Sequence, residues 1–147
     1  MVASATAADI PSWLELAREV EPLFGAMPMF DVTLKARIAE GAALCVRGEG
    51  GVVLGGVLLG GEAPDNWIRW LAVRGSARGQ GIGARLLREV LARWSAPCTI
   101  SLATFGPGAP GGGAARRLYE RHGFAAGAML PGGPESGTRQ RYTLVRL

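Results

Sequence analysis

Apolar residues recur at helical spacing in the first part of the chain. Between residues 7 and 24 they occupy every third or fourth position, which is typical of a helix with one buried face. Pro11 falls in the first turn, where a helix tolerates proline. A second, shorter helix is predicted over Phe30–Glu40 and ends at Gly41.

The middle of the chain alternates between strand patterns and a helix pattern. Residues 42–61 are two apolar runs separated by Arg-Gly-Glu-Gly-Gly, which predicts a β-hairpin. Residues 67–74, rich in aromatic and β-branched side chains, predict a third strand. Residues 81–94 return to helical spacing, and Cys98–Phe105 predicts a fourth strand.

The last third of the chain predicts one helix and two strands. The helix covers residues 112–122 and ends at Gly123, a residue type that commonly follows a helix end. Residues 124–130 and 139–147 read as antiparallel strands. The order ααβββαβαββ predicts one α/β (α+β) domain over residues 1–147. Its central mixed sheet is mostly antiparallel and flanked by helices, with one parallel crossover.

Composition is consistent with one cytoplasmic globular domain. The chain has 147 residues, 48% of them hydrophobic and 19% charged. The N-terminus lacks the basic and apolar regions of a signal peptide, and the apolar stretch 51–61 is too short to span a bilayer. Cys45 and Cys98 lie in apolar runs without metal-like spacing, so we expect buried free thiols, no bound metal and no membrane partner.

Arginine dominates the positive charge. The formal net charge is +4, with Lys35 as the only lysine. The arginines are scattered and few aromatic residues lie among them, a pattern that disfavours a nucleic-acid surface. Because the guanidinium group holds phosphate and carboxylate oxygens through several donors, a small anionic ligand fits this composition better.

A glycine-rich turn, Arg78–Gly83, separates a predicted strand from a predicted helix. It lacks the lysine of a Walker phosphate loop, and a dinucleotide fingerprint starting at Gly81 fails because Leu86 takes the third glycine position. What remains is a main-chain anion site, in which amides of residues 79–84 face one point at the helix N-terminus. The alternative is a plain turn that requires a positive φ angle.

Two motifs resemble a known family. The stretch Ala-Arg-Gly-Gln-Gly-Ile-Gly-Ala, residues 77–84, resembles the [RQ]-x-x-G-x-[GA] signature of the GNAT superfamily of N-acetyltransferases. Residues 114–124 resemble its second motif, a helix that carries a tyrosine and is followed by Gly-Phe. The resemblance covers about residues 40 to 146, and the element order agrees with it.

The resemblance implies that acetyl-CoA is the co-substrate and that a primary amine of a small molecule, peptide or protein attacks it directly. It also implies that the cofactor is bound by Leu71, Ala72, Val73, Arg78, Gly79, Gln80, Gly81, Ile82, Gly83 and Ala84. The strand residues would pair with the pantetheine arm, on a strand that bulges and separates from its neighbour, and the Val73 amide would stabilise the oxyanion.

Tyr119 is the catalytic residue that the resemblance implies. A departing thiolate benefits from a proton, and a tyrosine that is protonated at neutral pH can supply it. Taken without its motif, Tyr119 would read as a core aromatic on an amphipathic helix. His122, in the last turn of that helix, is expected to cap it rather than act as a base.

The sequence also departs from the family pattern. The strand before the glycine turn carries no carboxylate to act as a base, and the nearest acids are Glu62 and Asp65. Gly75 and Gly112 stand where proline and asparagine are common. These departures keep an alternative open, a non-catalytic acyl-CoA-binding sensor or interaction module on the same fold.

By the same resemblance, the acceptor is expected to lie among three segments, residues 24–31, 67–70 and 139–142. Three arginines in or beside them, Arg69, Arg139 and Arg141, suggest an acceptor that carries a carboxylate. The sequence is compatible with either a monomer or a homodimer.

Overall fold

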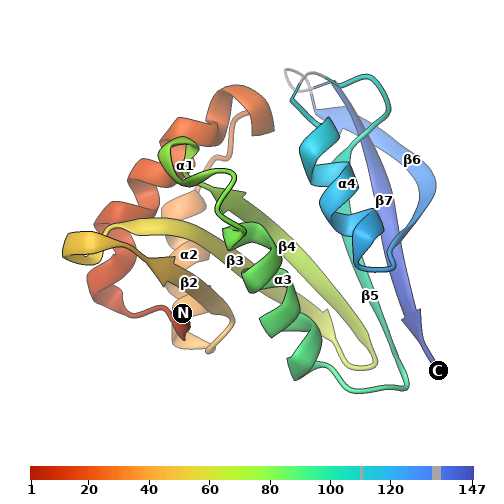
Figure 1. Ribbon diagram of the computed structural model, residues 1–147, viewed down its shortest axis with the longest axis horizontal. Helices are drawn as coiled ribbons and strands as arrows, with labels where there is room; N and C mark the ends of the chain where they lie inside the picture. The colour runs from red at the N-terminus through yellow and green to blue at the C-terminus, as the bar shows by residue number, and fades with distance from the viewer. Residues whose placement is uncertain (110, 134–136) are drawn as a thin grey trace.

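The computed structural model describes residues 1–109, 111–133 and 137–147 (Figure 1). The strands are β1 (Val2–Ser4), β2 (Ala43–Arg47), β3 (Val53–Glu62), β4 (Asp65–Val73), β5 (Cys98–Phe105), β6 (Ala125–Gly133) and β7 (Gly137–Arg146). The helices are α1 (Ile10–Phe24), α2 (Phe30–Ala39), α3 (Ile82–Arg93) and α4 (Gly113–Arg121), and short 3₁₀ turns cover Ala7–Asp9, Glu49–Gly51 and Gly75–Ala77.

Within the described residues, the strands form one seven-stranded sheet in the order β1-β2-β3-β4-β5-β7-β6. β4 and β5 are parallel, and the other neighbouring pairs are antiparallel. The predicted fold class is therefore confirmed, and so is every predicted helix and strand. The sequence reading missed β1, because three residues are too few to display an alternating pattern.

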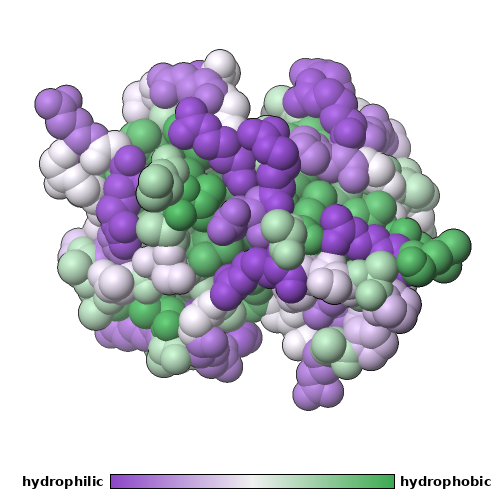
Figure 2. All heavy atoms as spheres, turned by 60° about the horizontal axis from the view of Figure 1, so that its bottom comes forward, coloured by the Kyte–Doolittle hydropathy of each residue, from purple (hydrophilic) through white to green (hydrophobic). Residues whose placement is uncertain are grey.

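Helices cover both faces of the sheet and define two apolar clusters. Side chains of α3 and α4 pack on one face with Val57, Ile68 and Leu102. Side chains of α1 and α2 pack on the other face with Leu58 and Trp70. Figure 2 shows one side of the molecule, on which hydrophilic and hydrophobic side chains are interspersed.

The structure also places the two cysteines and shows the lengths of the helices. Cys45 and Cys98 are buried and free, as predicted, and burial raises the pKa of the Cys45 thiol. No helix in the described part of the chain is long and apolar enough to cross a membrane.

A β-bulge in β4 determines how the centre of the sheet is built. Across the β3–β4 pair, Trp70 lies opposite Leu58 while Ile68 lies opposite Leu59, so Arg69 is the extra residue. The bulge changes which face of the sheet the strand presents. Ile68 packs in the cluster beneath α3 and α4, and Trp70 packs in the cluster beneath α1 and α2.

β4 and β5 separate directly after this bulge. Their parallel pairing covers only residues 65–68 of β4 and residues 99–102 of β5. Beyond Ile68 the strands diverge, as Figure 1 shows, and the last residues of β5 pair only with β7. The expected bulge and separation of this strand are confirmed.

Gly56→Ala tests the packing of α1 on β3, which depends on the contact between Trp13 and Gly56. Trp13 is fully buried, and a Cβ added at Gly56 would lie 2.5 Å from its ring. We expect Gly56→Ala to lower the free energy of unfolding by about 1–3 kcal/mol, because the ring has to move. Urea unfolding measures the loss.

Gly113→Ala is the matched control. Gly113 is exposed in the first turn of α4, and an added Cβ meets only the flexible end of Arg117, 3.1 Å away. Alanine improves helix propensity there by up to about 1 kcal/mol. Equal losses in the two variants would contradict the proposed role of Gly56 beneath Trp13.

Candidate active site

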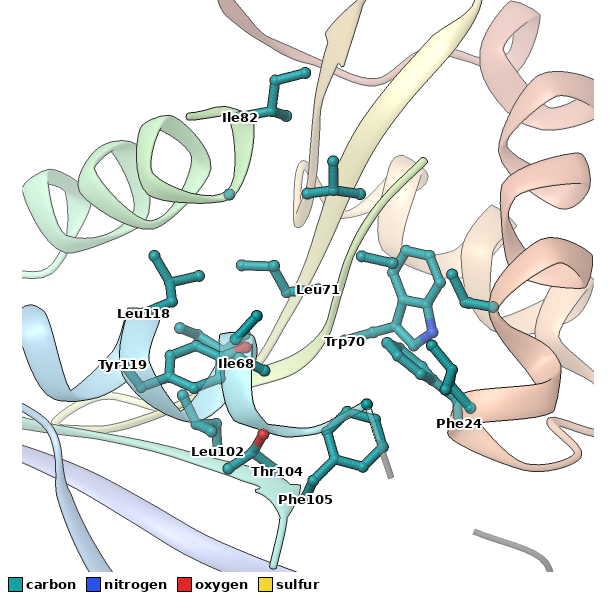
Figure 3. Close-up of a pocket in the computed structure, with 18 of the residues that line it drawn as sticks. Phe24, Ile68, Trp70, Leu71, Ile82, Leu102, Thr104, Phe105, Leu118 and Tyr119 are labelled. Atoms are coloured by element: carbon teal, nitrogen blue, oxygen red, sulfur yellow. The ribbon is translucent and has the colours of Figure 1, made fainter. Parts of the chain in front are cut away.

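A cleft of about 700 Å³ lies where β4 and β5 separate (Figure 3). The end of α1, the second half of β4, the glycine turn, the end of β5 and the first turns of α4 line it. Every residue predicted to bind the cofactor lines this cleft except Gln80, which is exposed outside it. Phe24, Trp70, Leu71, Ile82 and Tyr119 surround the same space from four elements.

The free edge of β4 presents main-chain polar groups to the cleft. The Arg74 amide donates to the Leu54 carbonyl at 2.6 Å, which makes these two residues a hydrogen-bonded pair. Because such pairs alternate along an antiparallel ladder, the amides and carbonyls of Leu71 and Val73 face away from β3. They therefore face the space that β5 has left.

The glycine turn has its two left-handed residues at Gly79 (φ 81°) and Gly81 (φ 76°). A Cβ added at either position would meet no atom within 4 Å, so backbone conformation rather than space requires glycine there. Gly83 differs, since a Cβ there would lie 3.3 Å from a Leu118 methyl. Its small size lets the start of α3 approach α4.

Six successive amides at this turn are unpaired. Among the residues that the structure describes, none of the N–H groups of residues 79–84 donates to a protein acceptor. The first paired amide in α3 belongs to Arg85, which donates to the Gly81 carbonyl at 3.0 Å. Together with the positive end of the helix dipole, these free donors give the mouth of the cleft an arrangement that favours a negatively charged group.

Arg78 stands beside these amides. Its side chain is exposed, and its Nε donates to the Val73 carbonyl at 3.4 Å. The guanidinium group therefore lies between the free edge of β4 and the glycine turn.

Tyr119 is both a core residue and part of the cleft wall. It is 6% exposed, and its ring packs against those of Phe124 and Tyr142 at centroid distances of 5.8 and 6.3 Å. In Figure 3 its hydroxyl points toward Ile68. Within the described residues this hydroxyl has no hydrogen-bond partner, and burial raises its pKa well above the usual value.

Tyr142 provides a contrast to Tyr119 on the same side of the sheet. It is fully buried and does not line the cleft. Its hydroxyl donates to Glu120 Oε2 at 2.9 Å. Of these two neighbouring tyrosines, Tyr119 is thus the one whose hydroxyl is available to a ligand.

Neither of the two acids that precede the predicted strand at residues 67–74 lies in the cleft. Glu62 and Asp65 face each other at the β3–β4 turn, and Asp65 accepts a 2.8 Å hydrogen bond from the Thr99 hydroxyl. They lie at the opposite end of β4. Among the described residues that line the cleft, the charged side chains are those of Arg69, Arg78, Arg121 and Arg139.

His122 has the capping role that the sequence predicts. Its Nδ1 donates to the Leu118 carbonyl at 2.8 Å, which satisfies a carbonyl at the C-terminus of α4. Gly123 follows with φ 93° and ends the helix.

The aromatic end of the cleft contains part of the expected acceptor region. The rings of Phe24 and Trp70 lie 5.9 Å apart, those of Phe24 and Phe105 lie 5.8 Å apart, and the Trp70 indole N–H donates to Met27 Sδ at 3.2 Å. Met29 and Phe30 instead line a separate hollow of about 320 Å³ between α1 and α2. Phe30 nevertheless packs against Trp70 of the cleft wall at a centroid distance of 5.1 Å, and the expectation that this segment faces the acceptor stays a prediction.

Sequence reasoning missed several hydrophobic walls of the cleft. They comprise Val20 and Leu23 from α1, Leu102, Thr104 and Phe105 from β5, and Ala115 and Leu118 from α4. The helical spacing that marked α1 and α4 as amphipathic could have indicated some of them. It could not show that the covered space is a cleft rather than packed core.

Comparison with known proteins identifies the family. Residues 40–126 match the family model described as the acetyltransferase (GNAT) domain. The chain therefore belongs to the GNAT acetyltransferase family. Among curated protein sequences, none matches it significantly.

Solved structures share the fold over the whole chain. Ard1 from Thermoplasma volcanium is 19% identical, with a TM-score of 0.80, and the match covers 100% of this chain and 97% of that one. The phosphinothricin acetyltransferase from Sinorhizobium meliloti in complex with AcCoA is 20% identical, with a TM-score of 0.77 and coverage of 99% and 88%. The ribosomal-protein-S18-alanine N-acetyltransferase from Escherichia coli is 18% identical, with a TM-score of 0.73 and coverage of 99% and 93%.

Two substitutions at Gly81 test the geometry of the turn. Gly81→Ala should lower the free energy of unfolding by about 1–2 kcal/mol, because a β-carbon disfavours a positive φ. Gly81→Asn should cost less, since asparagine adopts the left-handed conformation more readily. Urea unfolding measures both, and equal stability of wild type and the alanine variant would show that φ is not positive there.

Proposed function

We propose that the protein is an N-acetyltransferase, which transfers the acetyl group of acetyl-CoA to a primary amine of a small molecule or peptide by direct attack. The observation that carries the proposal is the run of unpaired amides at residues 79–84, next to the free edge of β4. One turn and one strand edge then hold two different parts of the same cofactor.

The pyrophosphate would lie on the glycine turn. The amides of residues 79–84 donate to its oxygens, the α3 dipole favours its charge, and the exposed guanidinium group of Arg78 can add charged donors. The pantetheine arm would extend along β4. Its amide groups can pair with the free main-chain groups of Leu71 and Val73, as an added strand would.

The chemistry needs one forming bond, one breaking bond and two proton transfers. The neutral amine attacks the thioester carbon, and the Val73 amide donates to the oxyanion that forms. As the C–S bond breaks, the Tyr119 hydroxyl donates its proton to the leaving thiolate, and the proton that the new amide nitrogen releases is returned through solvent to the Tyr119 oxygen. Because burial raises the pKa of Tyr119, the residue stays protonated at neutral and moderately alkaline pH.

The proposed acceptor end is the aromatic part of the cleft. Phe24, Trp70 and Phe105 supply apolar walls there. Two of the three named structural neighbours are described as acetyltransferases, and the one from Sinorhizobium meliloti is in complex with AcCoA. These similarities support the cofactor assignment and do not specify the acceptor.

A non-catalytic acyl-CoA-binding module is the second candidate. The observation that favours it is the set of charged side chains described in the cleft, which are all arginines. Arginine remains protonated in proteins and does not serve as a base. Thiol release from acetyl-CoA in the presence of an amine panel distinguishes an enzyme from a binding module.

Ligand-dependent stability tests cofactor binding. Acetyl-CoA and CoA should each raise the melting temperature, because a ligand at a hundred times its Kd adds roughly 2.7 kcal/mol to stability. ATP should raise it much less, since it lacks the pantetheine arm that pairs with β4. A differential melting experiment measures all three, and an equal shift with ATP would contradict the proposed role of the strand edge.

Tyr119→Phe tests the general acid. We expect kcat to fall by about 10²–10⁴-fold, with an unchanged Kd for acetyl-CoA, because only the proton donor is lost. Tyr142→Phe is the matched control. This variant loses the hydrogen bond from the Tyr142 hydroxyl to Glu120, which should lower the free energy of unfolding by about 1 kcal/mol, but it should retain kcat. A full retention of kcat in Tyr119→Phe would exclude the general-acid role.

A further inference from the structure

We infer that the acceptor carries a carboxylate as well as its amine, and that Arg69 and Arg141, whose guanidinium groups both stack on the Trp67 indole, bind this carboxylate. The inference rests on the proposed function and names the substrate class of the same cleft. Three observations carry it: the geometry of this arginine pair, its lack of acidic partners, and its position on the sheet.

Both guanidinium groups lie on one ring. The central carbon of Arg69 is 4.7 Å from the Trp67 ring centroid, and that of Arg141 is 4.9 Å from it. The two like charges are therefore less than 10 Å apart. Stacking of this kind leaves the donor edges of a guanidinium group available to a planar anion.

Each side chain is also held in place. The Arg69 side chain lies against Gly60, where an added Cβ would come within 2.9 Å of it. Arg141 donates from Nη2 to the Ser101 hydroxyl at 3.1 Å. Neither arginine has to fold onto a new surface to meet a ligand, so little conformational entropy is lost on binding.

No carboxylate neutralises the pair within the described part of the chain. The ion pairs found there join Arg47 to Asp9 and Arg37 to Glu40. Both Arg69 and Arg141 are exposed. Two close positive charges without a counter-charge favour an anionic ligand and disfavour a polycationic one.

The pair opens onto the acceptor end of the cleft. Arg69 is the bulge residue at which β4 leaves β5, and it lines the cleft. Arg141 lies opposite Ala103 of β5, which is exposed and also lines the cleft. Arg141 itself does not line the cleft, so a ligand would contact Arg69 from within the cleft and would meet Arg141 at its edge, beyond Ala103.

The pair is separate from the proposed phosphate site. Successive strand residues point to opposite faces, and Ile68 packs beneath α3 and α4. Trp67 therefore lies on the other face of the sheet from the helix whose N-terminus carries the free amides. The phosphates of a cofactor bound at the glycine turn do not account for these two arginines.

The neighbouring walls indicate the rest of the acceptor. Phe24, Trp70 and Phe105 provide an apolar surface beside the arginine pair. The substrate class is therefore a small amine with an apolar or aromatic body and a carboxylate, such as an amino acid or an aminobenzoate.

Matched acceptors test the inference on the wild-type protein. The pairs are phenylalanine with phenylalanine amide, 4-aminobenzoate with 4-aminobenzamide, and β-alanine with β-alaninamide. In at least one pair, the protein should acetylate the carboxylate compound with a kcat/KM about 10–100-fold higher than that of the matching amide. The neutral amide cannot form the charged hydrogen bonds that a carboxylate makes with the guanidinium groups. Spermidine should be a poorer acceptor than the best carboxylate.

Arg69→Gln and Arg141→Gln should each remove most of that preference by raising KM for the carboxylate, with kcat for the amide nearly unchanged. Arg93→Gln is the control, because Arg93 is exposed in the last turn of α3, far from the cleft. The melting shift with acetyl-CoA should be the same in all three variants.

The outcomes separate this inference from the proposed function. A protein that acetylates amines without preferring any carboxylate, or that prefers spermidine, overturns the inference and leaves the transferase proposal standing. A preference that survives in both arginine variants also overturns it. Absence of both an acetyl-CoA melting shift and amine acetylation overturns the proposed function and the inference together.

Discussion

The divergence of β4 from β5 after Ile68 is the constraint on which the site depends. A parallel pair that stays in register would bury its main-chain groups in a ladder and leave no space for a ligand. Here four residue pairs hold the strands together, and beyond them the main-chain groups of Leu71 and the Val73 amide have no strand partner, while the Val73 carbonyl accepts only from Arg78 Nε. Hydrophobic side chains from α1, β5 and α4 line the space between the two halves of the sheet.

The bulge at Arg69 connects this opening to the packing of both faces. In a strand without the extra residue, Trp70 would point to the same face as Ile68. Because Arg69 is inserted, Ile68 packs in the cluster beneath α3 and α4 while Trp70 packs in the cluster beneath α1 and α2. The same residue places a guanidinium group at the point where the strands part. Fold and recognition therefore depend on one local irregularity.

Much of the fold could be predicted from the sequence, because hydrophobic spacing marks each long helix and strand, as in α1 and α3. The glycine turn was also predictable, since two glycines in the left-handed region between a strand and a helix leave few other geometries. Which side chains line the cleft could not be predicted from the sequence. Met29 and Phe30 fit an apolar acceptor wall by composition, yet the turn of chain before α2 directs them to a separate hollow. The Arg69–Trp67–Arg141 stack joins β4 and β7, and because Arg141 follows Arg69 by 72 residues, no local sequence pattern contains the stack.

Gly112 shows why a departure from a family pattern has to be interpreted in three dimensions. By sequence, glycine in place of asparagine suggests a lost hydrogen bond to the cofactor. In the structure, a Cβ at this position would lie 2.4 Å from the Phe105 Cβ, so any larger side chain would displace the end of β5. Phe105 in turn packs against Phe24 across the cleft. Glycine at this position therefore allows Phe105 and the aromatic wall to stand close to the N-terminus of α4.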